Sequence, residues 1–91
     1  MSIYSGPAKR SVMIAGHATS ISLEPLFWDA LKAAAAANTL PLSALVARID
    51  AERIVVTDPP NLASAIRLWL FARSSAGEQR AGLAGDLGEH G

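Results

Sequence analysis

Two pairs of side chains near the start of the chain have the chemistry to bind a phosphate or another polar ligand. Lys9 and Arg10 are adjacent cations that can hold phosphate groups, although two basic residues near a terminus are also ordinary solvated charge. Ser20 and Ser22 alternate with apolar residues, so a strand would place both hydroxyls on one face. That face can contact nucleic acid, or it can be a polar sheet surface in water. All four residues are therefore candidate ligand contacts.

The rest of the sequence gives little support for catalysis. It has no cysteine, no metal-ligand spacing and no glycine-rich phosphate loop, and no Ser–His–Asp set falls on the predicted rigid elements. His17, beside Gly16, could be a ligand or a pH-sensitive contact, but a histidine there is more often a turn residue. Trp28 and Trp69 could line a pocket, but large aromatics at helical spacing usually belong to the core. We therefore expect a binding protein that is not an enzyme and has no cofactor and no metal.

Composition and charge favour one small domain that is only faintly basic. The chain has 91 residues, 51% of them hydrophobic, and no cysteine, so its core is marginal and we expect oligomerisation to add stability. Residues 1–73 hold seven Lys/Arg and five Asp/Glu, whereas residues 74–91 hold one Arg and three acids. No apolar run approaches the roughly 18 residues of a membrane helix, and no signal-peptide pattern opens the chain. The sequence thus predicts a cytoplasmic protein with no membrane partner.

Two short strands are expected to position the basic pair and the serine pair. Residues 1–8 contain Ser, Gly and Pro without periodicity, which predicts a flexible N-terminal arm. Residues 9–14 have a strand-like composition, and residues 19–23 alternate polar and apolar side chains. Gly16 permits a turn between them, so they form either a hairpin or one bent strand with a bulge. We expect strand 19–23 to lack a partner within its own unit, which predicts pairing with the same strand of a second copy.

Three amphipathic helices are predicted after the strands. The first runs from about Pro25, a residue suited to a first helical turn, to Ala37. The second covers residues 42–53, and the third covers residues 61–73 together with an N-cap at its start. The apolar face does not continue into residues 74–91, which predicts a disordered tail.

Asp50 has two candidate partners. It follows Ile49 on a strongly apolar helix, and Arg53 lies three residues further on, where an ion pair would stabilise the helix slightly. Alternatively, Arg67 of the third helix could reach Asp50 and tie that helix to the first two. Both pairings remain open from the sequence.

The order of these segments resembles the ribbon-helix-helix superfamily, and more narrowly a group of small bacterial ribbon-helix-helix domain proteins. The resemblance covers residues 9–73 and rests on the ordered set rather than on any single motif. The segments that carry it are Lys9-Arg10-Ser11-Val12, Gly16-His17, Thr19-Ser20-Ile21-Ser22-Leu23-Glu24, Phe27-Trp28-Asp29-Ala30-Leu31, Leu42-Ser43-Ala44-Leu45-Val46, Ile49-Asp50 and Asn61-Leu62-Ala63-Ser64-Ala65-Ile66-Arg67.

The resemblance implies a mainly α fold with a short β-ribbon, built as an intertwined homodimer with an extra C-terminal helix. Two copies of strand 19–23 would pair antiparallel, and the helices would pack beneath them. Higher assembly is left open. The implied dimer core consists of Ile21, Leu23, Phe27, Leu31, Leu45, Val46 and Ile49.

The resemblance also implies a bacterial transcription regulator whose ribbon enters the major groove of DNA, with the start of the second helix facing a phosphate. The implied DNA contacts are Lys9, Arg10, Ala18, Ser20, Ser22 and Ser43. The sequence departs from the pattern at the ribbon serines, where DNA-binding members commonly carry Arg, Lys, Gln or Asn, and at Pro41, where a capping Ser or Thr is common. The alternative is a protein-interaction or small-ligand-binding module on the same dimeric fold.

Overall fold

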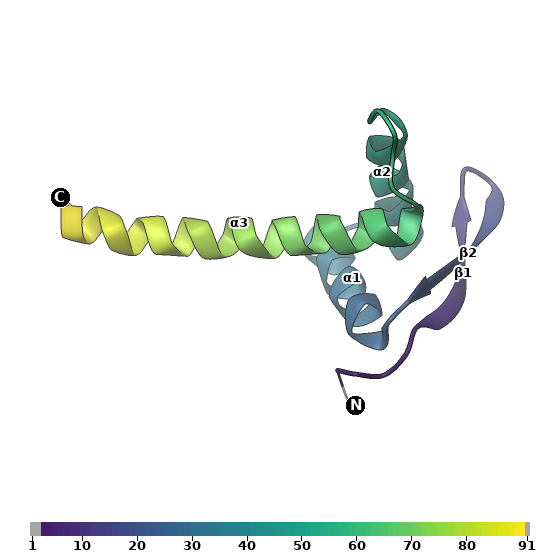
Figure 1. Ribbon diagram of the computed structural model, residues 1–91, viewed down its shortest axis with the longest axis horizontal. Coiled ribbons are helices and arrows are strands. Elements are labelled where there is room, and N and C mark those ends of the chain that lie inside the picture. Colours follow the sequence, from purple (N-terminus) through teal and green to yellow (C-terminus); the bar gives the residue numbers. More distant parts are fainter. Residues whose placement is uncertain (1–2, 91) are drawn as a thin grey trace.

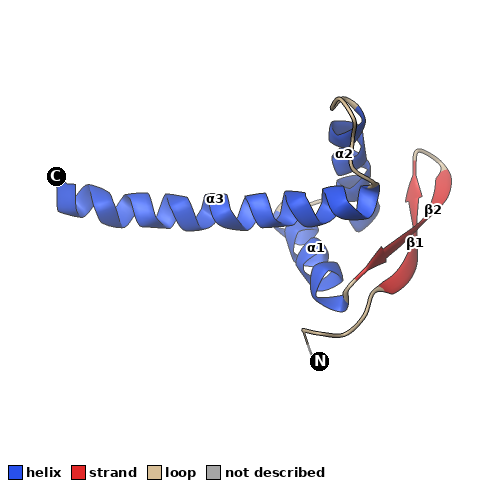
Figure 2. Cartoon of the chain, in the orientation of Figure 1, coloured by secondary structure: helices blue, strands red, loops and turns tan. Residues whose placement is uncertain are grey.

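A β-ribbon followed by three helices makes up the chain. The computed structural model describes the backbone of residues 3–90 and the side chains of residues 3–76. The elements are β1 (Ala8–Ile14), β2 (His17–Leu23), α1 (Pro25–Ala37), α2 (Leu42–Ile54) and α3 (Leu62–His90). Figure 1 and Figure 2 show the ribbon at one end, packed against the helices, while α3 extends away from it. The predicted fold class, mainly α with a short ribbon, is confirmed.

The two strands form an antiparallel hairpin within one chain. Their register runs from Ile14 opposite His17 at the turn to Ala8 opposite Leu23 at the open end. The turn residues Ala15 and Gly16 have φ of 50° and 82°, as a type I′ hairpin turn requires. The hairpin interpretation is therefore confirmed. The expectation that strand 19–23 lacks a partner in its own unit is wrong, because this tight turn brings β1 alongside it.

Alternation along the strands gives the ribbon two unlike faces. Residues opposite each other in an antiparallel pair share a face, so the register assigns every side chain of the ribbon to the inner or the outer face. On the inner face Val12, Ile21 and Leu23 are buried against the helices. The side chains of the outer face are all exposed: Lys9, Ser11, Met13, Ala18, Ser20 and Ser22.

The core lies between the inner face of the ribbon and the three helices. Six of the seven residues predicted for a dimer core are buried within the single chain, and Phe27 is half-buried. Trp28 is fully buried, which confirms its assignment to the core. Trp69 is only half-buried and packs at the edge of this cluster. Among the described residues no helix alone is long and apolar enough to cross a membrane, although α1 and α2, bent by 98°, pass that test together.

Helix α1 ends in a Schellman motif without the usual glycine. The N–H of Leu40 donates to the carbonyl of Ala35 at 2.9 Å, and the N–H of Thr39 donates to that of Ala36 at 3.0 Å. Thr39 has a φ of 56°, a left-handed conformation that is costly for a β-branched residue. This turn aims the chain from α1 into α2.

Hydrogen bonds from two arginines connect α2 and α3 to neighbouring segments of the chain. Arg53 donates to Oδ1 of Asp50 at 3.0 and 2.8 Å and to the carbonyl of Pro60 at 3.1 Å, which confirms the predicted pairing within the helix. Arg67 donates instead to Oε1 of Glu24 at 3.0 and 2.8 Å. The alternative pairing of Arg67 with Asp50 is therefore wrong, because the start of α3 packs close to the junction of β2 and α1.

The boundaries that the sequence predicts differ slightly from those of the elements. Strand β1 begins at Ala8, the last residue of the predicted arm. Helix α3 continues past residue 73 to His90, through the predicted tail. The side chains of residues 77–91 lie outside the described part, and the disordered tail and the division into 1–8, 9–73 and 74–91 stay predictions.

Replacing Thr39 by glycine should raise the free energy of unfolding by about 1 kcal/mol, because glycine adopts a left-handed φ without steric cost. Urea unfolding followed by circular dichroism measures the change. The matched control is Ala36→Gly, an exposed position inside α1, which should lower stability by about 1 kcal/mol. A loss of stability in Thr39→Gly would contradict the left-handed geometry.

A double-mutant cycle tests the partner of Arg67. Glu24→Ala and Arg67→Ala should have non-additive effects on the free energy of unfolding, since the two side chains are hydrogen-bonded. Asp50→Ala and Arg67→Ala should be additive in the same assay, because Asp50 pairs with Arg53. The reverse pattern would show that Arg67 binds Asp50 after all.

The same ion pair predicts a pH dependence. The residue's own backbone N–H and the Arg67 guanidinium lower the pKa of Glu24 below its ordinary value of 4.5. The ionised carboxylate therefore stabilises the fold above the unfolded-state pKa, and this contribution is lost as pH falls through the folded-state pKa. Glu24→Gln should be less stable than wild type at pH 7 and should match it once Glu24 is protonated. A difference that persists unchanged in strong acid would exclude this origin.

Candidate nucleic-acid interface

Three cross-strand pairs make up the outer face of the ribbon. Lys9 lies opposite Ser22, Ser11 lies opposite Ser20, and Met13 lies opposite Ala18. The pairs run in that order from the open end of the hairpin towards the turn. The resulting surface carries one cation and three hydroxyls, with two small or apolar side chains near its tip.

Four of the predicted contacts therefore gather on one surface: Lys9, Ala18, Ser20 and Ser22. Ser11 belongs with them and was not predicted from the sequence. The sequence indicates this position for Ser11 only if the two strands form a hairpin, because a two-residue turn at Ala15-Gly16 places Ser11 opposite Ser20.

Arg10 lies on the opposite face from Lys9, because successive strand residues point to opposite sides. Its guanidinium stands 5.3 Å from the centre of the Trp28 ring. Trp28 in turn donates its indole N–H to the carbonyl of Ala8 at 2.8 Å. These two contacts fix β1 to α1, a positioning role that the basic pair in the sequence did not suggest.

Ser43 lies in the helical layer rather than on the ribbon. It is the second residue of α2 and is half-buried. Pro41 occupies the N-cap position with φ of −61° and ψ of 152°, and no side chain caps the helix. The carbonyl of Pro41 accepts the N–H groups of Ala44 and Leu45 at 3.1 and 3.2 Å. Of the first turn this leaves the N–H groups of Leu42 and Ser43, which have no acceptor within the helix and could meet a phosphate.

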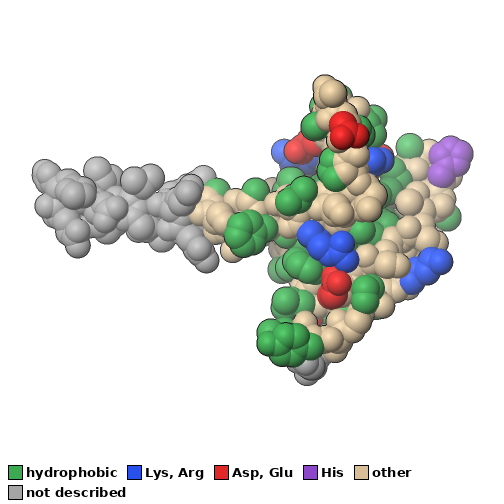
Figure 3. All heavy atoms as spheres, viewed as in Figure 1, with side chains coloured by type: hydrophobic (Ala, Val, Ile, Leu, Met, Phe, Trp, Pro, Cys, Tyr) green, Lys and Arg blue, Asp and Glu red, His purple; other side chains and the backbone are tan. Residues whose placement is uncertain are grey.

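Most cations of the described residues are engaged within the chain. Arg48, Arg53 and Arg67 pair with carboxylates, and Arg10 and Arg73 stand over tryptophan rings. Lys9 and Lys32 have neither kind of partner among residues 3–76. Figure 3 shows basic side chains in separate spots on the visible face rather than in one continuous patch. On the outer face of the ribbon, Lys9 is therefore the cation left without such a partner among the described residues.

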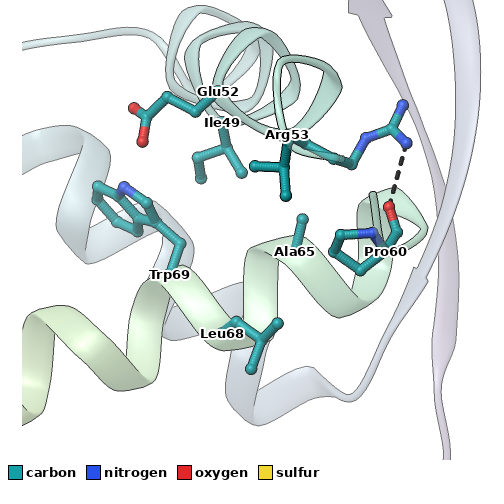
Figure 4. Close-up of a pocket in the computed structure, with 8 residues that line it drawn as sticks. Ile49, Glu52, Arg53, Pro60, Ala65, Leu68 and Trp69 are labelled. Atoms are coloured by element: carbon teal, nitrogen blue, oxygen red, sulfur yellow. Dashed lines mark hydrogen bonds between the residues drawn. The ribbon is translucent and has the colours of Figure 1, made fainter. Parts of the chain in front are cut away.

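A shallow groove lies between α2 and α3, away from the ribbon. It has a volume of about 330 Å³, and Figure 4 shows Ile49, Leu68 and Trp69 lining it. Trp69 therefore takes part in a surface hollow, whereas Trp28 does not. His17 is exposed beside the hairpin turn, and no group of three or more metal-ligating residues occurs in the described part of the chain.

Comparison with known proteins agrees with this architecture. Neither the curated proteins nor the solved structures gave a match. A family model described as a ribbon-helix-helix domain matches residues 7–74, which include the whole ribbon, α1, α2 and the first part of α3. Since the match spans most of the chain and the elements follow one another in the order that the sequence predicts, the chain belongs to the ribbon-helix-helix family.

Proposed function

We propose that the protein is a cytoplasmic transcription regulator that binds DNA as a homodimer, with the outer face of its ribbon in the major groove. Ribbon-helix-helix domains commonly bind DNA as regulators, and the family match supports the same class here. The observation that carries the proposal is the outer face itself, where Lys9 and five other side chains are all exposed and no element among the described residues covers them. A two-stranded ribbon fits the major groove, which is about 12 Å wide.

The open edges of the hairpin support the homodimer. In a hairpin with a two-residue turn, the flanking residues form a hydrogen-bonded pair and the pairs then alternate. Counting from Ile14 and His17, the backbone groups of Ser11 on β1 and of Ser20 on β2 point away from the hairpin. No described backbone bond from another element reaches them. Such edges favour pairing with another strand, and a hairpin alone is marginally stable.

Strand β2 is the edge that we assign to the partner copy. It leads directly into α1, so pairing β2 with its two-fold mate would bring the helices of both copies beneath one continuous sheet. A hollow of about 230 Å³ separates Ser20 and Ser22 on this edge from Leu62 at the start of α3, so the helix does not fill the space beside β2. The proposed homodimer thus has four strands: the two central β2 strands would enter the major groove, which admits two strands, and the outer β1 strands would carry Lys9 towards the phosphates at its edges.

Proline at facing edge positions tests this assignment. Ser20→Pro should convert the dimer to monomer in sedimentation equilibrium at about 10 μM, because proline removes the outward N–H and obstructs strand addition. Ser11→Pro, directly opposite on β1, is the matched control and should remain dimeric. The reverse result would place the interface on β1. A wild-type chain that stays monomeric at 100-fold higher concentration would contradict the homodimer.

Lysine substitutions test the DNA contact. Affinity for a mixed-sequence duplex should fall steeply between about 50 and 200 mM salt, because bound phosphates release counterions. Lys9→Ala should weaken binding and lower the slope of log K against log salt by about 2 per dimer, one for each lysine removed. Lys32→Ala, which removes the same charge from an exposed position on α1, should leave the slope unchanged. Equal effects of the two substitutions, or no binding in dilute salt, would contradict the ribbon interface.

The α2–α3 groove favours a second candidate function, a protein-interaction or small-ligand module on the same fold. The groove is largely apolar, and two of its lining side chains, Val56 and Leu68, are exposed at 52% and 62%. Native mass spectrometry of the purified chain tests it. A stoichiometric small molecule that is lost in Trp69→Ala would support this function, whereas a mass equal to that of the bare chain would count against a retained ligand.

A further inference from the structure

We propose that the ribbon binds duplex DNA mainly through the sugar-phosphate backbone of the DNA, with little preference for base sequence. This inference rests on the proposed function and names the partner of the same site: duplex DNA in general rather than one operator. It comes from the register of the hairpin, which decides which side chains face the groove. Without that register the basic pair at the start of the chain would suggest the opposite conclusion.

Discrimination between base pairs depends on side chains that make two hydrogen bonds to one base edge. Arg and Lys do so with guanine, Asn and Gln with adenine, and Asp and Glu accept from cytosine. Of the six outer-face side chains only Lys9 belongs to these types, and it lies at the open end of the ribbon. Arg10 has the right chemistry, but the strand turns it to the inner face, where it stands over Trp28.

The centre of the ribbon is occupied by the facing pair Ser11 and Ser20. A hydroxyl both donates and accepts a hydrogen bond, so it can satisfy either kind of group on a base edge or a phosphate oxygen. Both side chains are short, which limits them to one contact each. The centre of the ribbon can therefore bind DNA without distinguishing one base pair from another.

The tip of the ribbon adds only weak selectivity. Met13 and Ala18 face each other there, and apolar groups of this kind can contact the methyl group of thymine. A second copy would present the same six side chains again, so dimerisation increases the number of contacts but introduces no new kind of contact. DNA-binding proteins that choose an operator prefer it by roughly 10³- to 10⁷-fold, and this surface lacks the groups that produce such ratios.

Selection from a randomised duplex pool, followed by affinity measurement, tests the inference. The full-length chain is incubated in dilute salt with labelled duplexes of about 20 random base pairs, and the retained DNA is sequenced over several rounds. We expect no consensus, and the best and worst individual duplexes should differ in affinity by less than about 100-fold. A consensus bound more than about 100-fold better than the pool would overturn the inference and leave DNA binding intact.

Two variants test whether the side chains of the outer face select particular bases. Lys9→Ala should weaken binding to every duplex by a similar factor, whereas the double variant Ser20→Ala and Ser22→Ala should leave the ranking of duplexes unchanged. A change of ranking in the double variant would show that the serines select bases and would overturn the inference. Retention of no duplex at all would instead overturn the proposed function, and the inference with it.

Discussion

The burial of Trp28 beneath the ribbon is the interaction on which the rest of the structure depends. The side chain is fully buried, its indole N–H donates to the carbonyl of Ala8, and Arg10 stands over its ring. A two-stranded hairpin has too little contact surface to be stable alone, so it needs such an anchor in the helices. Because side chains alternate, holding one face of the ribbon inward also fixes which residues face outward.

The ion pairs within the chain also determine which charged side chains remain available at the candidate site. Arg53 ties α2 to the loop before α3, and Arg67 ties α3 to Glu24, where the ribbon passes into α1. These arginines stabilise the scaffold and are not free to meet a ligand. The surface left to the ribbon therefore has one lysine and a set of hydroxyls, which suits attachment to a polyanion better than recognition of a particular base sequence.

Much of the fold could be predicted from sequence because it depends on local patterns. Alternation in residues 19–23 predicted the burial of Ile21 and Leu23, and helical spacing predicted the burial of Leu45, Val46 and Ile49. The hairpin remained one of two interpretations, because its turn sequence, Ala15-Gly16, lacks the Asn or Asp that most strongly signals a type I′ turn.

The site could be predicted only in part, since it depends on register and packing. Lys9 and Arg10 form one motif in the sequence but belong to opposite faces, a difference that appears only once the strand pairing is fixed. Ser11 was missed for the same reason. The sequence suggested Asp50 as a partner for Arg67, and only the crossing of α3 over the start of α1 brings Arg67 to Glu24, 43 residues away in sequence.

An NMR titration tests most directly whether the outer face of the ribbon is the binding surface. The ¹⁵N-labelled chain is titrated with a mixed-sequence duplex, and the chemical shifts of its amides are measured. If DNA binds there, the amide signals of Lys9, Ser11, Ser20 and Ser22 should shift progressively, while the amide signal of Ala65 and the indole signal of Trp69, both in the α2–α3 groove, should not move. Shifts confined to the groove, with the ribbon amides unchanged, would contradict the ribbon as the binding surface.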